Sequence, residues 1–127
     1  MKKLGNIEIL QSSCNLSTIN DGRGGIFTWL PDQPILEFNM VLFFPDKVRG
    51  HHYHPEFTEY FLVVEGNGVL TTTSEKGNIS MHIDKGTCIK IPPKTPHVVH
   101  STTNMTAVSM LSKPWGECTK PIVKIEI

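Results

Sequence analysis

The residues with the clearest chemical potential lie between Arg49 and Gly66, where the sequence reads RGHHYHPEFTEYFLVVEG. His52 and His54 are two positions apart, so on an extended strand both imidazoles point to the same face. Glu59 follows after a proline, where a short bend would bring its carboxylate back to the histidines. His97, in the downstream segment IPPKTPHVVH, is a candidate for the same place. Three nitrogens and one carboxylate could then share a site.

Neutral imidazole and carboxylate groups together suit zinc, iron, manganese, nickel or copper. They also leave coordination positions open for water or substrate. A histidine-rich turn beside a glutamate is equally compatible with a solvated surface cluster that binds nothing. The spacing alone leaves both interpretations open.

The elements that must position these residues are expected to be short β-strands. The segment Ile35–Phe44 is apolar at nearly every position, which predicts a central strand covered on both faces. The pair Asn67-Gly68 predicts a type I′ hairpin after the strand Tyr60–Val64, and Glu75–Asn78 predicts a second hairpin. Further strands are expected at Ile7–Leu10, Ile26–Leu30, Thr87–Ile91, Thr106–Leu111 and Ile122–Ile127.

Alternation along these strands separates the remaining histidines. His97 and His100 are three apart and point to opposite sides of one strand, so only one of them can readily reach the site. His82 has the opposite parity from its apolar neighbours and is expected to face solvent. In the segment before the histidines, Asn39 and Phe43 share one side of a strand and would face a metal if that side is internal. For Phe43, simple core packing is an equal alternative.

Composition narrows the class of protein. A chain of 127 residues fits one domain, residues 1–127, and its ten glycines and nine prolines favour many short strands in an all-β fold. Lys and Arg balance Asp and Glu at twelve each, so no net field would draw the chain to nucleic acid or to an acidic membrane surface. No apolar run approaches the ~20 residues that span a bilayer.

The cysteines and the first residues suggest a cytoplasmic location. Cys14, Cys88 and Cys118 are odd in number and widely spaced, which argues against a disulfide framework and for a reducing compartment. The opening MKKLGNIEILQSS has interrupted apolar residues and does not resemble a signal peptide.

Two ordered segments resemble the conserved motifs of the cupin superfamily. The first is carried by Gly50, His52, His54, Glu59 and Gly66, and the second by Gly86, Pro92 and His97. The second departs from the family pattern, since Lys94 stands where glycine is usual and Ser101 where asparagine is frequent. The resemblance implies a double-stranded β-helix, also called a jelly-roll barrel. It also implies a divalent metal ion bound by His52, His54, Glu59 and His97.

A finer resemblance points to sugar chemistry. Asp21, Arg23, Gly24 and Phe27 are similar to the entry segment of cupin-type nucleotide-sugar epimerases and ketoisomerases, whose arginine contacts the nucleotide diphosphate. The run from Phe38 to Gly66 is similar to the zinc-binding cupin domain of bifunctional capsule-precursor enzymes. Zinc is therefore the first expectation for the metal, with iron, manganese or nickel as alternatives.

These resemblances imply a mechanism in which a proton is abstracted next to a carbonyl of a sugar bound at the metal. The metal and Arg49 would stabilise the enolate oxygen. Arg23 would hold phosphates, while Asn39 and Phe43 would contact the substrate. His51 or Glu59 would act as the base. Tyr60 is a possible acid, but alternation places it on the other face of its strand.

Two other functions use the same residues. With iron, the ligand set could support a dioxygenase acting on a small organic substrate. Without turnover, the barrel could be a sugar-binding cupin. In each case the partner is a small molecule. The alternating edge Val123–Ile127 invites pairing with a second chain, so a homodimer is expected.

Overall fold

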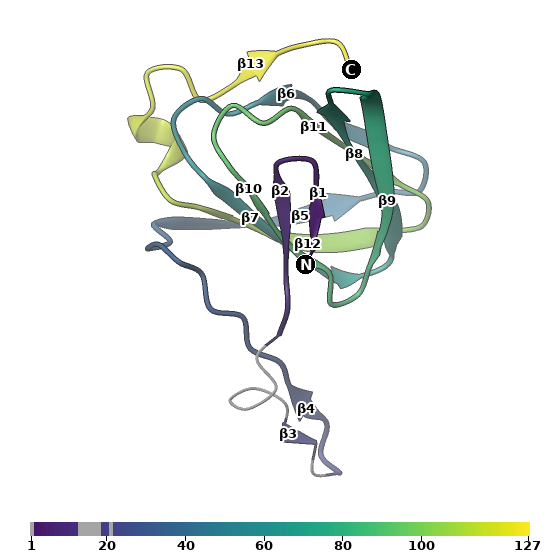
Figure 1. The fold of residues 1–127 in the computed structure, drawn as a ribbon. Coiled ribbons are helices and arrows are strands. Elements are labelled where there is room, and N and C mark those ends of the chain that lie inside the picture. Colours follow the sequence, from purple (N-terminus) through teal and green to yellow (C-terminus); the bar gives the residue numbers. More distant parts are fainter. Residues whose placement is uncertain (1, 13–18, 21) are drawn as a thin grey trace.

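The protein folds into two antiparallel β-sheets that enclose one apolar core (Figure 1). The computed structural model describes residues 2–12, 19–20 and 22–127. The six-stranded sheet has the order β1-β2-β10-β7-β12-β5 and contains β1 (Lys3–Leu4), β2 (Ile7–Leu10), β10 (Cys88–Ile91), β7 (Glu59–Glu65), β12 (Met105–Leu111) and β5 (Glu37–Phe43). The five-stranded sheet has the order β13-β6-β11-β8-β9 and contains β13 (Val123–Lys124), β6 (Val48–Tyr53), β11 (His97–Ser101), β8 (Asn67–Ser74) and β9 (Gly77–Asp84).

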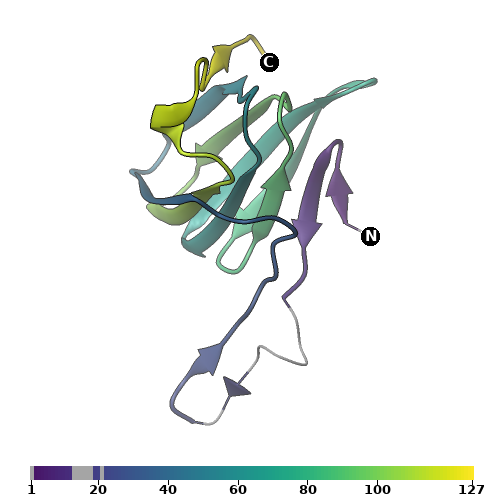
Figure 2. The same cartoon turned by 90° about the vertical axis from the view of Figure 1, so that its left-hand side faces the viewer.

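A small hairpin stands apart from these sheets. It consists of β3 (Ile19–Asn20) and β4 (Gly25–Ile26), and we call it the arm. The arm projects from the barrel at the end away from β13 and from the 3-10 helix η1 (Trp115–Glu117), as two views show (Figures 1 and 2).

Alternation of apolar side chains explains the core. On β7, Phe61 and Val63 point inward, and on β12 Met105, Ala107 and Leu111 do the same. These side chains meet inward-facing residues of the other sheet, such as Leu70 and Val99. Burying apolar faces of two sheets against one another is the ordinary basis of a β-sandwich or jelly roll. The predicted all-β jelly-roll barrel is confirmed.

One of the two predicted hairpins is wrong. The second, at Glu75–Asn78, forms as expected, because Ser74 pairs with Gly77 across β8 and β9. The first does not form, since β7 and β8 belong to different sheets. The chain crosses between the sheets at Gly66, which has φ +94° and lies against the Asn104 carbonyl. Only a glycine fits there. The chain therefore turns at Gly66, and Asn67-Gly68 does not form the predicted type I′ turn.

The segment Ile35–Phe44 does form a strand, but its predicted position is wrong. β5 lies at the edge of the six-stranded sheet and, among the strands that the structure describes, pairs only with β12. Its outward side chains Phe38 and Met40 are 77% and 73% exposed. The apolar run predicts burial on both faces, whereas none of the described residues covers its outer face.

Two other expected strands are shorter than predicted. Of Ile26–Leu30, only Ile26 lies in a strand, at the end of β4. Of Ile122–Ile127, only Val123–Lys124 forms β13. The structure contains, among the described residues, no helix with the length and apolar character needed to cross a membrane.

Candidate metal centre

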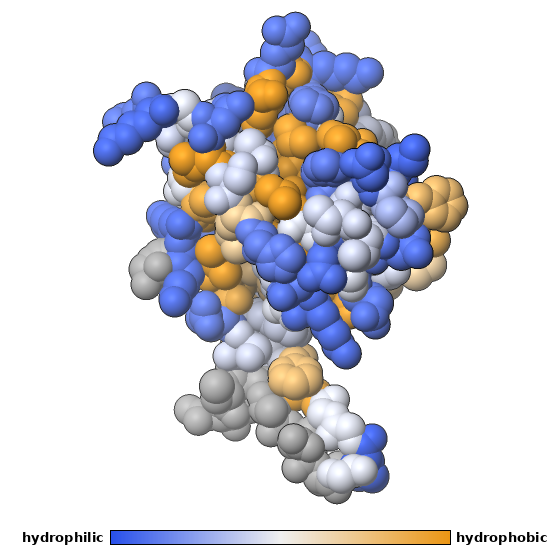
Figure 3. Space-filling model, turned by 90° about the vertical axis from the view of Figure 1, so that its right-hand side faces the viewer, coloured by the Kyte–Doolittle hydropathy of each residue, from blue (hydrophilic) through white to orange (hydrophobic). Residues whose placement is uncertain are grey.

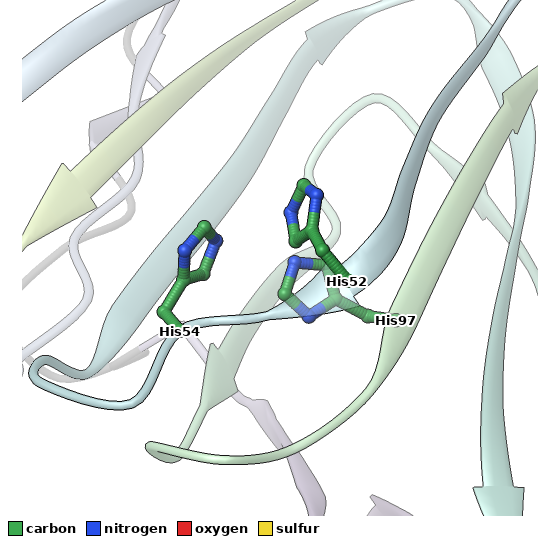
Figure 4. A group of neighbouring side chains, drawn as sticks. All are labelled: His52, His54 and His97. Atoms are coloured by element: carbon green, nitrogen blue, oxygen red, sulfur yellow. The ribbon is translucent and has the colours of Figure 1, made fainter. Parts of the chain in front are cut away.

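Three histidines converge inside the barrel. His52 lies on β6, His54 directly follows that strand, and His97 begins β11. Their ring centroids are 4.6 Å apart for His52 and His54, 4.8 Å for His52 and His97, and 5.2 Å for His54 and His97. One ring nitrogen of each lies within 4.8 Å of the others, and Figure 4 shows the three rings side by side. This group could hold a metal ion.

Strand pairing explains why residues so far apart in the sequence meet. β11 runs antiparallel to β6, and His97 stands directly opposite His52 in the register. Beside this pair, Gly50 has φ +125°, and a Cβ there would lie 2.5 Å from the His97 carbonyl oxygen. Gly50 therefore allows the two strands to approach closely next to the histidines.

The backbone orients two of the imidazoles. His54 Nδ1 lies 2.9 Å from the Pro121 carbonyl oxygen, and His97 Nδ1 lies 3.0 Å from that of Thr95. A carbonyl oxygen only accepts hydrogen bonds, so Nδ1 carries the proton in both rings. The Nε2 lone pairs are left directed toward the site, which is the arrangement found in metal-binding histidines.

Glu59, the first residue of β7, adds the carboxylate. Its Oε1 lies 3.3 Å from His54 Nε2 and 3.5 Å from His97 Nε2. Its Oε2 accepts a hydrogen bond of 2.6 Å from the Ser109 hydroxyl. Burial raises the pKa of Glu59, but contact with His54, the charges that His97 and His54 carry when acid protonates them, and the Ser109 hydroxyl outweigh burial and lower it to about 2. The carboxylate is therefore anionic at neutral pH.

The imidazoles of His52 and His97 favour their neutral form in the metal-free protein. Burial, followed by the proximity of His97 and His54, lowers the pKa of His52 to about 4. Burial also lowers the pKa of His97. A neutral imidazole keeps the lone pair that a metal requires, so these rings are available as ligands at neutral pH.

The site opens into a cavity of about 250 Å³. Its wall is mostly apolar, with Phe43 and Trp115 among its residues. The exposed Arg49 also lines it, with its guanidinium carbon 5.3 Å from the centre of the Phe43 ring. Arg49 Nη2 donates a hydrogen bond of 3.2 Å to the Leu42 carbonyl oxygen. The cavity thus combines an apolar wall with a cation at its rim.

The structure brings together six of the nine residues singled out from the sequence: His52, His54, Glu59, His97, Arg49 and Phe43. The other three do not line the cavity. Asn39 is exposed and donates a hydrogen bond of 2.9 Å to Glu37 Oε2. His51 is exposed, with φ +59°. Arg23 lies on the arm, between β3 and β4, and Asp21 beside it is outside the described residues.

The predictions for the remaining polar side chains on these strands are confirmed. His82 is exposed, and His100 points away from the site and pairs with Asp46 at 2.6 Å. Tyr60 faces the other side of β7, where its hydroxyl donates to Asp32. Burial and this hydrogen bond raise the pKa of Tyr60 to about 12.

Sequence reasoning missed the residues that support the site. Ser109 is the hydroxyl on an otherwise apolar inward row of β12, and that isolated polar position was a usable signal. Trp115 lies 5.9 Å from the His54 ring between centroids, and Phe57 stacks on the same ring at 4.6 Å. No local pattern identifies Pro121 as the hydrogen-bond acceptor for His54, because the two are 67 positions apart.

Comparison with known proteins places this geometry in a family. The family model described as "Cupin domain" matches residues 39–112, which include the histidines, Glu59 and Ser109. A curated relative, the uncharacterized protein MJ1618 of Methanocaldococcus jannaschii, is 37% identical over 54 residues, or 42% of this chain and 40% of that protein. The chain thus spans less than half the length of this relative.

Similar solved structures share the fold at low identity. A 3,4-ketoisomerase from Helicobacter canadensis has a TM-score of 0.79 and 15% identity, covering 95% of this chain and 92% of that one. A mutant of the 3,4-ketoisomerase QdtA from Thermoanaerobacterium thermosaccharolyticum, in complex with TDP-4-keto-6-deoxyglucose, has a TM-score of 0.76 and 13% identity, covering 96% and 89%. CapF, a capsular polysaccharide assembling protein of Staphylococcus aureus, has a TM-score of 0.65 and 20% identity, covering 87% of this chain and 32% of that one.

Proposed function

The chain belongs to the cupin family, and from this premise we propose that it is a metal-dependent isomerase or epimerase of a nucleotide sugar. The observation that carries the proposal is the convergence of three imidazoles and one carboxylate in a cavity with an arginine at its rim. The solved neighbours named as ketoisomerases support the choice of substrate class, although at their identities they share only the fold.

We assign His52, His54, Glu59 and His97 as the metal ligands, with zinc as the metal. The donor set fits this assignment, because the Nε2 atoms of His54 and His97 point at Glu59 Oε1 and that carboxylate is anionic. A bound zinc ion would polarise the sugar carbonyl as a Lewis acid. The apolar wall would keep water scarce around the sugar, which strengthens electrostatic interactions at the reacting atoms.

Arg49 would stabilise the negative charge that develops on the carbonyl oxygen when the adjacent proton leaves. A donor placed in advance at such a position contributes ~3–4 kcal/mol to transition-state stabilisation. Its guanidinium lies at the cavity rim, beside the Phe43 ring. Arg23 would contribute to phosphate binding only if the arm reaches a substrate outside this cavity, because it does not line the cavity itself.

Turnover also requires a proton acceptor near the sugar. With the four ligands set aside, Arg49 is the remaining ionisable side chain among the described residues that line the cavity, and an arginine is no base at neutral pH. For turnover we retain His51 as the proposed base, which requires its exposed ring to turn toward the cavity mouth. The lack of a free base among the described residues that line the cavity favours a second candidate function, in which the cupin binds a sugar without converting it.

One experiment separates these functions. The zinc-loaded protein is incubated with TDP-4-keto-6-deoxyglucose in deuterated water, and incorporation of deuterium is followed by NMR and mass spectrometry. An isomerase or epimerase incorporates deuterium next to the carbonyl, and both H51A and R49Q slow the exchange while retaining zinc. Binding by calorimetry without exchange would establish the sugar-binding function. If the protein neither binds nor exchanges any of a panel of nucleotide sugars, both proposals are overturned.

Two further proposals concern the whole chain. We propose that residues 1–127 form a single cupin domain, which the one core shared by the two sheets supports. We also propose a cytoplasmic location, because Cys88 and Cys118 are free thiols. Cys14, the third cysteine, is outside the described residues.

A further inference from the structure

A loop beside the cavity is held against the barrel next to the metal centre. We call residues 112–121 the η1 loop, since they contain that helix. At its start, the Ser112 N–H donates a hydrogen bond of 3.1 Å to the Thr58 carbonyl oxygen, and the Thr58 N–H donates one of 2.9 Å to the Ser112 hydroxyl. At its end, the Pro121 carbonyl oxygen accepts the hydrogen bond from His54 Nδ1. Both ends of the η1 loop are therefore fixed.

A single carboxylate closes the base of the η1 loop. Glu56 Oε1 lies 2.9 Å from Lys113 Nζ, and Glu56 Oε2 accepts a hydrogen bond from the Lys120 N–H. The bond from Lys120, followed by that from Lys113, lowers the pKa of Glu56, so its carboxylate is anionic at neutral pH. Because Lys113 and Lys120 lie on either side of η1, these contacts restrict the helix between them.

Trp115, the first residue of η1, forms part of the cavity wall. Its ring lies 5.9 Å from that of His54 and 6.1 Å from that of Phe57, measured between centroids. The residue is nevertheless 41% exposed. Its indole is thus packed on one part of its surface and open on another, at the side of the cavity next to a proposed metal ligand.

Glu37, at the start of the edge strand β5, holds Trp115 in place. Its Oε1 accepts a 2.8 Å hydrogen bond from the Trp115 backbone N–H, and its Oε2 accepts one of 2.9 Å from Asn39 Nδ2. Hydrogen bonds to a carboxylate are stronger than those between neutral groups. Both oxygens are engaged, so the side chain of Glu37 is held in one orientation. Asn39, which does not line the cavity, thereby acts on it indirectly, through Glu37 and Trp115.

The two ends of the cavity differ in chemistry. Arg49, His52 and then His54 line it along β6 and just beyond, and Trp115 lies beside the last of these. Among the described residues that line the cavity, Arg49 is the one permanent cation. Anionic parts of a ligand are therefore favoured near Arg49, whereas its uncharged, apolar parts are favoured near Trp115.

We propose that Trp115 binds the sugar ring of the substrate and that Glu37 is the residue that positions Trp115. This inference rests on the proposed function, since it concerns the same substrate. A pyranose ring carries C–H groups on its faces, and such an apolar face packs well on the flat surface of an indole. With the sugar carbonyl near the metal ligands and Arg49, the ring would extend toward the aromatic end of the cavity and lie on Trp115.

The expected effect of Trp115 is on binding and not on the chemical step. An indole that contacts the C–H face of the ring does so equally before and during proton transfer, so its loss raises KM and leaves kcat unchanged. R49Q should do the opposite, because Arg49 is proposed to stabilise charge that develops only during the reaction. A nucleoside diphosphate without the sugar has no pyranose ring, so its affinity should not depend on Trp115.

The test measures two ligands on zinc-loaded protein by calorimetry, TDP-4-keto-6-deoxyglucose and TDP. W115L keeps an apolar side chain against His54 but removes the aromatic surface. It should bind the sugar nucleotide at least about 10-fold more weakly and bind TDP as wild type does. W115F restores an aromatic ring and should stay within about 3-fold of wild type for both ligands. Zinc titration and urea unfolding establish that each variant keeps its metal site and fold.

The role of Glu37 is tested with a conservative pair. E37A removes the acceptor of the Trp115 N–H and should weaken sugar-nucleotide binding, whereas E37Q keeps an amide oxygen there and should restore it. E75A is the matched control, because Glu75 is exposed in the turn between β8 and β9. β9 lies on the side of the barrel away from η1, where hydrophilic side chains are interspersed with apolar ones (Figures 1 and 3).

Fluorescence reports on the indole directly. W29F leaves Trp115 as the single tryptophan of the chain. Trp29 does not line this cavity, so W29F should bind the sugar nucleotide as wild type does. The sugar nucleotide should change the emission of Trp115 in W29F, and TDP should not. Adding E37A to W29F should reduce the change at equal ligand occupancy, because the indole is no longer held against the sugar.

The outcomes separate this inference from the proposed function. If wild type binds TDP-4-keto-6-deoxyglucose and folded W115L binds it as tightly, the role of Trp115 is overturned and the proposed function stands. Equal losses of TDP and sugar-nucleotide affinity in W115L would also overturn it, since the indole would then not act through the sugar. Equal affinities of E37A and E37Q would overturn the role of Glu37. A wild-type protein that binds no nucleotide sugar overturns both the inference and the proposed function.

Discussion

Replacing Ser109 with alanine should weaken metal binding although Ser109 is not itself proposed as a ligand. Its hydroxyl donates a 2.6 Å hydrogen bond to Glu59 Oε2, and both side chains are buried. This bond fixes the carboxylate so that Oε1 faces the Nε2 atoms of His54 and His97. Without it, Glu59 loses an orienting contact in a place where water cannot readily replace the donor.

The magnitude has two parts. A hydrogen bond to a charged group contributes about 1.5–3 kcal/mol, so the free energy of unfolding of the metal-free protein should fall by about that amount. Because this hydrogen bond is already present without metal, the effect on affinity comes from the lost orientation of the ligand. Loss of such supporting contacts typically lowers metal affinity by roughly 10- to 100-fold.

Urea unfolding of metal-free protein and zinc titration against a competing chelator measure these two effects separately. S80A is the matched control, because the Ser80 hydroxyl is exposed and contacts only Thr71 Oγ1 at 2.8 Å among the hydrogen bonds described. S80A should change the unfolding free energy by less than about 0.5 kcal/mol and leave zinc affinity unchanged. If S109A folds, loses stability and still binds zinc as tightly as wild type, Glu59 does not act as a ligand positioned by Ser109.

Two further predictions follow from local geometry. G66A should lower the free energy of unfolding by about 3 kcal/mol, because φ of +94° and contact with Asn104 and Met105 both oppose a Cβ. G77A, at φ +108° with nothing within 4 Å, should lower it by only ~1 kcal/mol; equal losses in urea unfolding would contradict this account. In the metal-free protein, the pKa of His52 is lowered from 6.5 to about 4, so the unfolded chain binds more protons between these values and stability should rise with pH there. H52Q should flatten that rise in unfolding experiments from pH 4 to 6.5, and an unchanged slope would show that His52 does not titrate as described.

The sequence carried enough information to locate the centre of the fold. The two-residue spacing correctly predicted that His52 and His54 share a face, and the parity of His97 and His100 correctly predicted that only one of them reaches the site. The family resemblance identified that residue as His97. That inference works because side-chain direction alternates strictly along a strand. The jelly roll itself required the family resemblance, since alternation alone does not order strands within sheets.

The parts that could not be predicted depend on contacts between distant segments. The exposure of β5 depends on its place at the sheet edge, and an apolar run looks the same whether it is covered by its own chain or by another. Asn39 lies nearer the start of β5 than Val41 and Phe43, which line the cavity, and His51 has a positive φ that interrupts the regular strand. Neither feature has a signature in the local sequence.

The central claim is that His52, His54, Glu59 and His97 bind one metal ion. The most direct measurement is anomalous diffraction at the zinc edge from crystals grown with zinc. We predict a single strong peak inside the barrel, with an imidazole nitrogen from each histidine and a Glu59 carboxylate oxygen at about 2.0–2.2 Å. A barrel with no anomalous peak between these side chains, or a peak that His97 does not contact, would contradict the account.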